Sequence, residues 1–200
     1  MNLPTPLTDS DIKKLRLGDI VYLSGKIFTG RDQVHKYFYE GNNPPVDLHG
    51  QVLYHCGPIA IRNNGDWDLW GFGPTTSIRQ EPYTDYVISK LGIKAIIGKG
   101  GMGKKTAAAC AKNKAVYLHA IGGCGVVLAN CVRKVHKLHL EKFGIPEAMW
   151  EVEVYRFPAI VTIDSEGHSL HTEIQAKSLE KLKKNGTNKK RSRNHATKRT

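Results

Sequence analysis

The chain has 200 residues, 40% of them hydrophobic, which is enough for a single domain with a sizeable core. It has no apolar run near the roughly 20 residues of a membrane span, and its N-terminus lacks the basic and apolar regions of a signal peptide, so we expect a cytoplasmic protein with reduced thiols. The net charge is +12, but ten of the 30 Lys and Arg residues fall within 177–200, so the rest of the chain is only mildly basic.

Apolar periodicity, turn signals and helix caps predict the elements of the N-terminal half. They are a helix capped at Ser10 and ending before Gly18, a strand–bend–strand at 19–30, a helix over 31–41, a strand at 51–61 interrupted by Gly57 and Pro58, a hairpin turn at 62–66, a returning strand at 67–73 and a loop at 73–80.

The C-terminal half begins with a β-α-β pattern, which is typical of a parallel sheet. The predicted elements are a helix over 83–92 capped by Gly92, a strand at Lys94–Ile97, a glycine loop, a helix at Thr106–Asn113, a strand at Ala115–Ile121, a second helix over 122–135, one or two strands at 150–164, a turn at 165–169 and a charged helix over 172–184. The order predicts a compact α/β domain with separate sheet and helix layers.

The range 185–200 has almost no apolar residues and cannot bury enough surface to fold alone. We therefore expect a single domain of residues 1–184 followed by a disordered basic tail of residues 185–200. A basic segment can bind nucleic acid. That function is the less favoured alternative, because the body shows no motif of interleaved aromatic and basic residues, and a solvated tail is the simpler interpretation.

The stretch KAIIGKGGMGKKT (94–106) has the look of a phosphate-binding loop. Such a loop requires G-x-x-x-x-G-K followed by Ser or Thr. Here Lys105 stands where the hydroxyl residue is needed, Thr106 comes one place late, and no strand downstream ends in the Asp that a magnesium site would use. An ATPase is therefore disfavoured. Exposed glycine amides before a helix still favour an anion, which can be a carboxylate as well as a phosphate.

The four cysteines have no spacing typical of a zinc or iron–sulfur site, and we interpret them as small buried hydrophobic residues. They are Cys56, Cys110, Cys124 and Cys131.

Three loops that follow strand-like runs each carry a cation. These cations are Arg31, Arg79 and Lys99. Because ligands bind at the carboxyl ends of strands in α/β folds, the three together could hold a small dicarboxylate. Taken singly, each is more simply a surface charge.

Six segments in one order resemble the β subunit of the class I, iron–sulfur-dependent hydro-lyases. This family comprises two-subunit fumarate hydratases and L-tartrate dehydratases, whose β part corresponds to the C-terminal domain of single-chain class I fumarases. The resemblance runs from about Leu7 to Leu170, and GPTT-x-x-R with GKGGMG twenty-odd residues later is its most specific pair. The segments are GRDQVH, VLYHCGPIA, GPTTSIR, GKGGMG, PEAMWEVEV and FPAIVTID.

The resemblance implies a swivelling β/β/α fold and a partner. In the family, a separate α subunit carries three cysteine ligands of a [4Fe–4S] cluster, so this chain is expected to bind no metal itself and to form one wall of the cluster site. It also implies an α₂β₂ assembly, and the reversible hydration of fumarate to (S)-malate. The alternative within the family is the dehydration of L-tartrate to oxaloacetate.

Carried onto this sequence, the resemblance makes Thr75 the catalytic base and assigns the substrate's carboxylates to Arg31, Arg79 and Lys99. A threonine base requires a strongly electropositive site, which these cations would supply. Alternatives stay open: Thr75 could cap the following helical segment, and Thr76 is a competing base.

Three further positions beside these residues carry expectations. His35 is expected to orient Arg31 or to pack, and Asp32 to start a helix or pair with an arginine. Gln80 departs from the Met that the family usually carries, which we expect to affect packing only.

Overall fold

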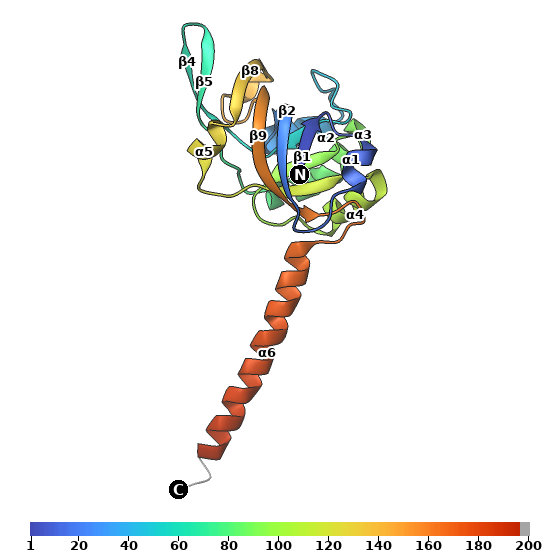
Figure 1. The fold of residues 1–200 in the computed structure, drawn as a ribbon, viewed down its shortest axis with the longest axis vertical. Helices are drawn as coiled ribbons and strands as arrows, with labels where there is room; N and C mark the ends of the chain where they lie inside the picture. The colour runs from blue at the N-terminus through green and yellow to red at the C-terminus, as the bar shows by residue number, and fades with distance from the viewer. Residues whose placement is uncertain (197–200) are drawn as a thin grey trace.

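The computed structural model describes the backbone of residues 1–196 and the side chains of residues 1–184. Figure 1 shows a mixed α/β domain from which one long helix projects. The strands are β1 (Asn2–Thr5), β2 (Ile20–Thr29), β3 (Val52–Tyr54), β4 (Ile59–Asn63), β5 (Asp66–Gly71), β6 (Ala95–Gly98), β7 (Val116–His119), β8 (Val132–His139) and β9 (Met149–Ile163). The helices are α1 (Asp9–Lys13), α2 (Asp32–Tyr39), α3 (Glu81–Leu91), α4 (Lys104–Asn113), α5 (Gly125–Ala129) and α6 (Leu170–Ala196), with 3₁₀ turns η1 (Ile78–Gln80) and η2 (Glu141–Phe143).

The main sheet closes on itself. Strands β2, β3, β6 and β7 are parallel neighbours, and β9 runs antiparallel to both β7 and β2. β1 extends the sheet beside β2, and β8 extends it beside β9. The central parallel strands β3, β6 and β7 are buried on both faces, which explains their mostly apolar sequences. In β6, Ile97 packs in one apolar cluster and Ile96 in another that includes residues of α2, α3 and α4.

The β4–β5 hairpin follows the sequence prediction. Asn64 and Gly65 join the two strands with φ of 50° and 93°. Left-handed backbone at both central positions is what a two-residue hairpin loop requires, and Asn-Gly supplies it. The predicted β-α-β unit is also confirmed as β6, α4 and β7.

The prediction of a helix over 122–135 was wrong for most of that range. Only Gly125–Ala129 is helical, and β8 begins at Val132. β8 pairs with β9 through two register shifts, between Val132 and Lys134 and between Val135 and Lys137. These bulges break the period of two and place valines three apart, which imitates a helical pattern.

Two boundaries near the N-terminus also differ from prediction. Helix α1 is capped by Thr8 rather than Ser10, through a capping box with Asp11. The expected bend in 19–30 is a bulge within one continuous strand, where the register against β9 shifts between Leu23 and Gly25. Residues 2–5, for which no element was predicted, form β1.

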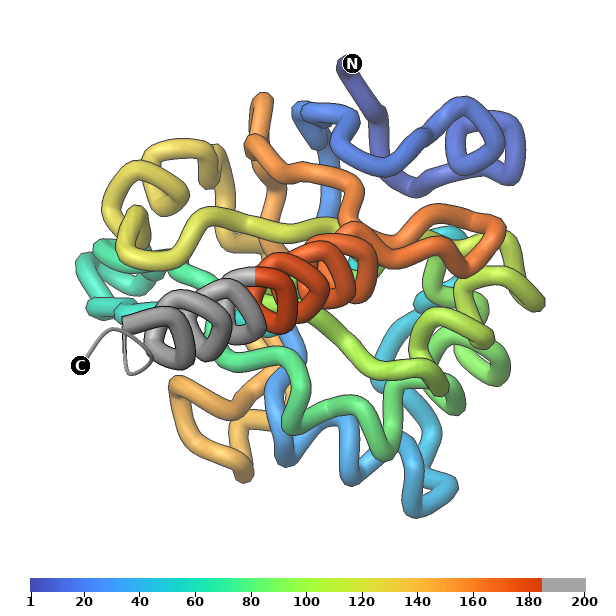
Figure 2. The backbone as a smooth tube through the Cα atoms, turned by 90° about the horizontal axis from the view of Figure 1, so that it is seen from below, coloured from blue at the N-terminus to red at the C-terminus, as the bar shows by residue number. Residues whose placement is uncertain are grey.

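Helix α6 starts at the end of the domain and points away from the sheet (Figures 1 and 2). Among the described residues, no helix is long and apolar enough to cross a membrane. The division into a domain of residues 1–184 and a disordered tail stays a prediction, and residues 197–200 of that tail lie outside the described part of the chain.

Candidate functional site

The parallel strands deliver polar side chains to one edge of the sheet. Arg31 follows β2, His55 follows β3, Lys99 follows β6 and His119 ends β7. Because these four strands are adjacent and parallel, their carboxyl ends meet at that edge. The topology therefore brings the predicted Arg31 and Lys99 to the same side of the domain.

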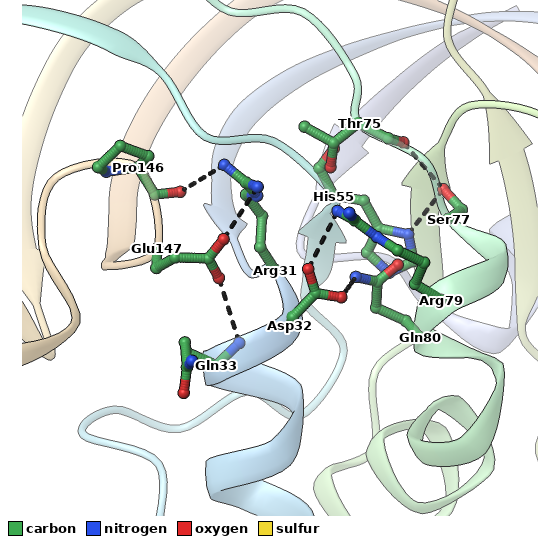
Figure 3. A network of polar contacts seen from close by, with 10 residues as sticks. All are labelled: Arg31, Asp32, Gln33, His55, Thr75, Ser77, Arg79, Gln80, Pro146 and Glu147. Atoms are coloured by element: carbon green, nitrogen blue, oxygen red, sulfur yellow. Dashed lines mark hydrogen bonds and ion pairs between the residues drawn. The ribbon is translucent and has the colours of Figure 1, made fainter.

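Arg31 stands at the start of α2 and is held by the segment before β9. Its Nη2 lies 2.9 Å from Glu147 Oε1, and its Nη1 donates to the Pro146 carbonyl at 3.3 Å. Its Nε is buried without a hydrogen-bond partner among the described residues. A Cβ at Gly57 would overlap the backbone carbonyl of Pro146 and come 2.6 Å from Arg31 Nη1, so glycine is needed where these groups meet. Figure 3 shows this network.

Arg79 is linked to the residue after Arg31. Its Nη2 lies 3.0 Å from Asp32 Oδ2, and Gln80 Nε2 donates to Asp32 Oδ1 at 2.6 Å (Figure 3). Asp32 is thus both in the first turn of α2 and an arginine partner, as expected. The amide of Gln80 thus makes a polar contact to the carboxylate that pairs with Arg79, and the expectation that Gln80 leaves the chemistry unchanged stays a prediction. A methionine could not make this bond.

Thr75 is bound to the main chain of His55. Its N–H donates to the His55 carbonyl at 2.7 Å, and its hydroxyl donates to the same oxygen at 3.0 Å. It is half-buried, whereas the competing Thr76 is exposed. The 3₁₀ turn that follows is capped by Ser77 without a side-chain bond, so the alternative of Thr75 as a helix cap is wrong.

Lys99 is exposed at the end of β6. A Cβ at Gly122 would meet its Cδ at 2.9 Å, so its stem lies against that glycine. No ion pair joins its ammonium group to another described residue, whereas Arg31 and Arg79 each have a carboxylate partner. Among the residues that the structure describes, Lys99 is therefore the cation of the three whose charge is least compensated.

Two buried histidines lie behind these residues, and sequence reasoning missed the importance of one of them. The rings of His35 and His55 pack edge to face with centroids 4.9 Å apart, and both are fully buried. Burial lowers the pKa of His35 to about 3 and holds the pKa of His55 well below its usual range. His35 makes no side-chain hydrogen bond to described residues, so it packs rather than orients Arg31. The signal for His55 was a polar residue directly after an apolar strand.

The N–H groups at the end of the glycine loop bind a carboxylate of the chain itself. The carboxylate of Glu81 accepts from the N–H groups of Gly103, Lys105 and Thr106 at 2.8, 3.0 and 3.2 Å. It also accepts the Thr106 hydroxyl at 2.6 Å. These are the donors that a phosphate would need at the N-terminus of α4. The donors predicted to favour an anion are taken by the chain's own Glu81, and a ligand carboxylate bound at this loop stays a prediction.

The cysteines do not provide a ligand set. Cys56 and Cys110 are buried, as predicted, while Cys124 and Cys131 are only partly buried. Burial raises the pKa of the Cys56 thiol, and it raises that of Cys110 to about 12, which disfavours the thiolate that a metal binds. Within the described residues, no group of three or more His, Cys, Asp or Glu side chains is placed to hold a metal ion.

The sheet edge that carries the predicted site residues does not line any of the four described cavities. Four cavities of about 310 to 830 Å³ lie elsewhere on the surface, and none of these four is lined by Arg31, Thr75, Arg79 or Lys99.

The chain is a mixed α/β domain with cationic side chains after the carboxyl ends of its parallel strands. The sequence profile of the family described as "Fumarase C-terminus" matches residues 1–174. The chain therefore belongs to the fumarase C-terminal family, which confirms the resemblance seen in its motifs.

Named relatives agree with this family. The chain is 49% identical to "Putative fumarate hydratase class I" of Geobacillus stearothermophilus over 91% of its length, but spans only 35% of that protein. It is 44% identical to "Putative L(+)-tartrate dehydratase subunit beta" of Methanocaldococcus jannaschii, covering 88% of this chain and 93% of the relative. It is 39% identical to "L(+)-tartrate dehydratase subunit beta" of Escherichia coli K12, covering 86% of each. The chain is thus a homologue of hydro-lyase β subunits.

Proposed function

We propose that this chain is the β subunit of a [4Fe–4S]-dependent hydro-lyase that reversibly hydrates fumarate to (S)-malate. The observation that carries the proposal is the linkage of two arginines from distant segments: Asp32, the residue after Arg31, pairs with Arg79. A site for a small diacid needs two separated cationic groups held in a fixed relation.

Arg31, Arg79 and Lys99 would bind the substrate's carboxylates. Arg79 is half-exposed, so its guanidinium retains N–H donors for a ligand beyond the one directed at Asp32. Lys99 supplies a charge that no described carboxylate compensates. The same cations would stabilise the dianionic aci-carboxylate that forms when the proton leaves C3 of malate.

Thr75 would act as the base that takes this proton. Its hydroxyl is half-buried at the same edge, and the fixed acceptor at the His55 carbonyl sets its orientation. The electropositive field is weaker than the sequence suggested, because Glu147 and Asp32 partly neutralise the two arginines. Lys99 therefore carries more of the field that an alkoxide requires.

The [4Fe–4S] cluster belongs to a separate α subunit in this proposal. Relatives named as β subunits, and the absence of a suitable ligand set among the described residues, support that division. When bound, such a cluster supplies a Lewis-acidic iron that takes the hydroxide from C2. The partner would also cover the open edge that carries Thr75 and exclude water from it.

The finer fold description and the assembly belong to the same proposal. A closed sheet with α2, α3 and α4 packed outside it supports the swivelling β/β/α domain. An α₂β₂ enzyme would follow from pairing this chain with its α subunit.

Dehydration of L-tartrate is the second candidate. The named tartrate dehydratase β subunits share this chain's length, whereas the higher identity is to the fumarate hydratase. Co-production of both subunits without oxygen, followed by assays with malate and with L-tartrate, separates the two. Turnover of neither substrate by a cluster-loaded pair would overturn the proposed function.

A further inference from the structure

His55 connects the strand layer to the loop that carries Thr75. Its N–H donates to the Ile97 carbonyl at 2.9 Å, which continues the β3–β6 pairing past the end of β3. Its carbonyl accepts both donors of Thr75. Its ring Nδ1 lies 2.8 Å from Ser77 Oγ (Figure 3). The main chain and side chain of this one residue thus hold both ends of the Thr75–Ser77 segment.

Ser77 in turn holds the start of the glycine loop. Its Oγ accepts the Lys99 N–H at 2.9 Å, and its own N–H donates to the Lys99 carbonyl at 3.4 Å. Gly98 permits this approach, because a Cβ there would overlap the Ser77 hydroxyl. The His55–Ser77 hydrogen bond therefore ties the loop of Thr75 to the backbone of Lys99.

The bond is short and buried. His55 and Ser77 are both fully buried. The Ser77 Oγ lies 2.8 Å from the ring nitrogen and 3.5 Å from the Thr75 carbonyl, so the ring is the closer of these two partners. The ring of His35 packs against the His55 ring at an interplanar angle of 70°. A continuous chain runs from the Lys99 N–H through the Ser77 hydroxyl to His55.

We propose that His55, through its hydrogen bond to Ser77, is a positioning residue that sets Thr75 relative to Lys99 in the hydro-lyase reaction. The inference rests on the proposed function. His55 touches no substrate in this role. It acts by fixing the proposed base and the proposed carboxylate-binding cation in one geometry, and a misplacement of about 1 Å at such a site can lower the rate about 100-fold.

The test compares four variants in the complete enzyme with its α subunit. His55→Leu removes the bond and keeps an apolar volume, whereas His55→Asn keeps a hydrogen-bonding group near the δ position. Ser77→Ala removes the same bond from the other side, together with the acceptor of the Lys99 N–H, with little change in volume. His35→Phe is the matched control, since His35 is as deeply buried and contacts the same ring without making a hydrogen bond.

We expect His55→Leu and Ser77→Ala to lower kcat at least tenfold with a smaller change in KM, His55→Asn to restore most of kcat, and His35→Phe to retain it. Wild-type kcat in Ser77→Ala would overturn the inference, and so would equal losses in His55→Leu and His55→Asn. If His55→Leu does not fold, Ser77→Ala and His55→Asn together decide, and a tenfold lower kcat in Ser77→Ala with kcat largely retained in His55→Asn supports the inference. An inactive wild-type complex would instead contradict the proposed function.

Discussion

The carboxylate of Glu81 accepts the Thr106 hydroxyl at 2.6 Å and thereby occupies the N-terminus of α4. The same carboxylate accepts three backbone N–H groups, each of which lies more than twenty residues later in the chain. A Cβ at Gly103 would come 2.5 Å from Glu81 Oε1, which explains the glycine there. The glycines of this loop thus admit an internal anion.

Glu81→Ala should destabilise the domain by about 1–3 kcal/mol, because it leaves donors at the start of α4 without partners, among them those of the buried Thr106. Urea unfolding of the isolated chain measures the change. Glu40→Ala is the control, since Glu40 is exposed and forms only an (i, i+4) pair with Lys36 at 3.7 Å. Equal stability of the two variants would contradict the capping role.

Lys99→Ala should lower kcat/KM about 100-fold, as expected for loss of one cation that stabilises charge in the transition state. Lys104, an exposed residue in the first turn of α4, gives the control. Lys104→Ala should retain the activity of the complete enzyme. The reverse order of effects, with nucleotide binding lost in Lys104→Ala, would favour the phosphate-binding alternative.

Much of this site could be predicted from the sequence, because one topological rule places residues after parallel strands at one edge. Arg31 and Lys99 came from that rule. The residues that contact these cations could not be predicted in this way, because those contacts join segments that are distant in the sequence. Glu147 lies more than a hundred residues from the arginine that it pairs with, and no local pattern indicates such a contact. The same applies to Glu81 at the glycine loop.

Errors in the predicted fold have a comparable cause. The strand that begins at Val132 was predicted as part of a helix. Its bulges arise only when it pairs with β9, so they cannot be recognised from its own sequence. The sequence of one strand shows only the resulting spacing of apolar residues. The regular β6–α4–β7 unit and the Asn64–Gly65 turn depend on local signals, and they were predicted correctly.

Thr75→Ala should lower kcat about 100-fold or more while KM changes little, because the variant loses the proposed base and keeps the cations that bind substrate. Thr75→Ser retains a hydroxyl and should recover part of the rate. Thr76→Ala serves as the comparison within the same loop. A large loss in Thr76→Ala together with normal turnover in Thr75→Ala would transfer the role of base to Thr76.

Gly98→Ala should destabilise the domain by about 1–3 kcal/mol, the usual range for overpacking a buried position. The added methyl group would overlap the Ser77 hydroxyl and lie 2.6 Å from Tyr117 Oη. Thermal unfolding, with kcat measured in parallel, checks both effects. Gly125→Ala is the control, because its Cβ would find its nearest atom at 3.5 Å. A fully stable, active Gly98→Ala variant would contradict the close approach of Ser77 to Gly98.

Acid should weaken the fold through its buried histidines. Burial lowers the pKa of His35 to about 3 in the folded chain, whereas an unfolded histidine titrates near its ordinary value of 6.5. Between these two values the unfolded state binds a proton that the folded state does not. The stability contributed by His35 is therefore fully present above pH 6.5 and is lost progressively as the pH falls toward 3.

His35→Phe should remove the proton that the unfolded state binds at this position. It keeps an aromatic ring against His55. The slope of the unfolding free energy against pH, measured with urea between pH 5 and 6, should then decrease by about 1.4 kcal/mol per pH unit. Phe38→Leu alters a buried residue of the same helix that does not titrate, so it should shift stability equally at every pH. An unchanged slope in His35→Phe would mean that His35 gains its proton in the folded chain, which its burial between α2 and the His55 ring opposes.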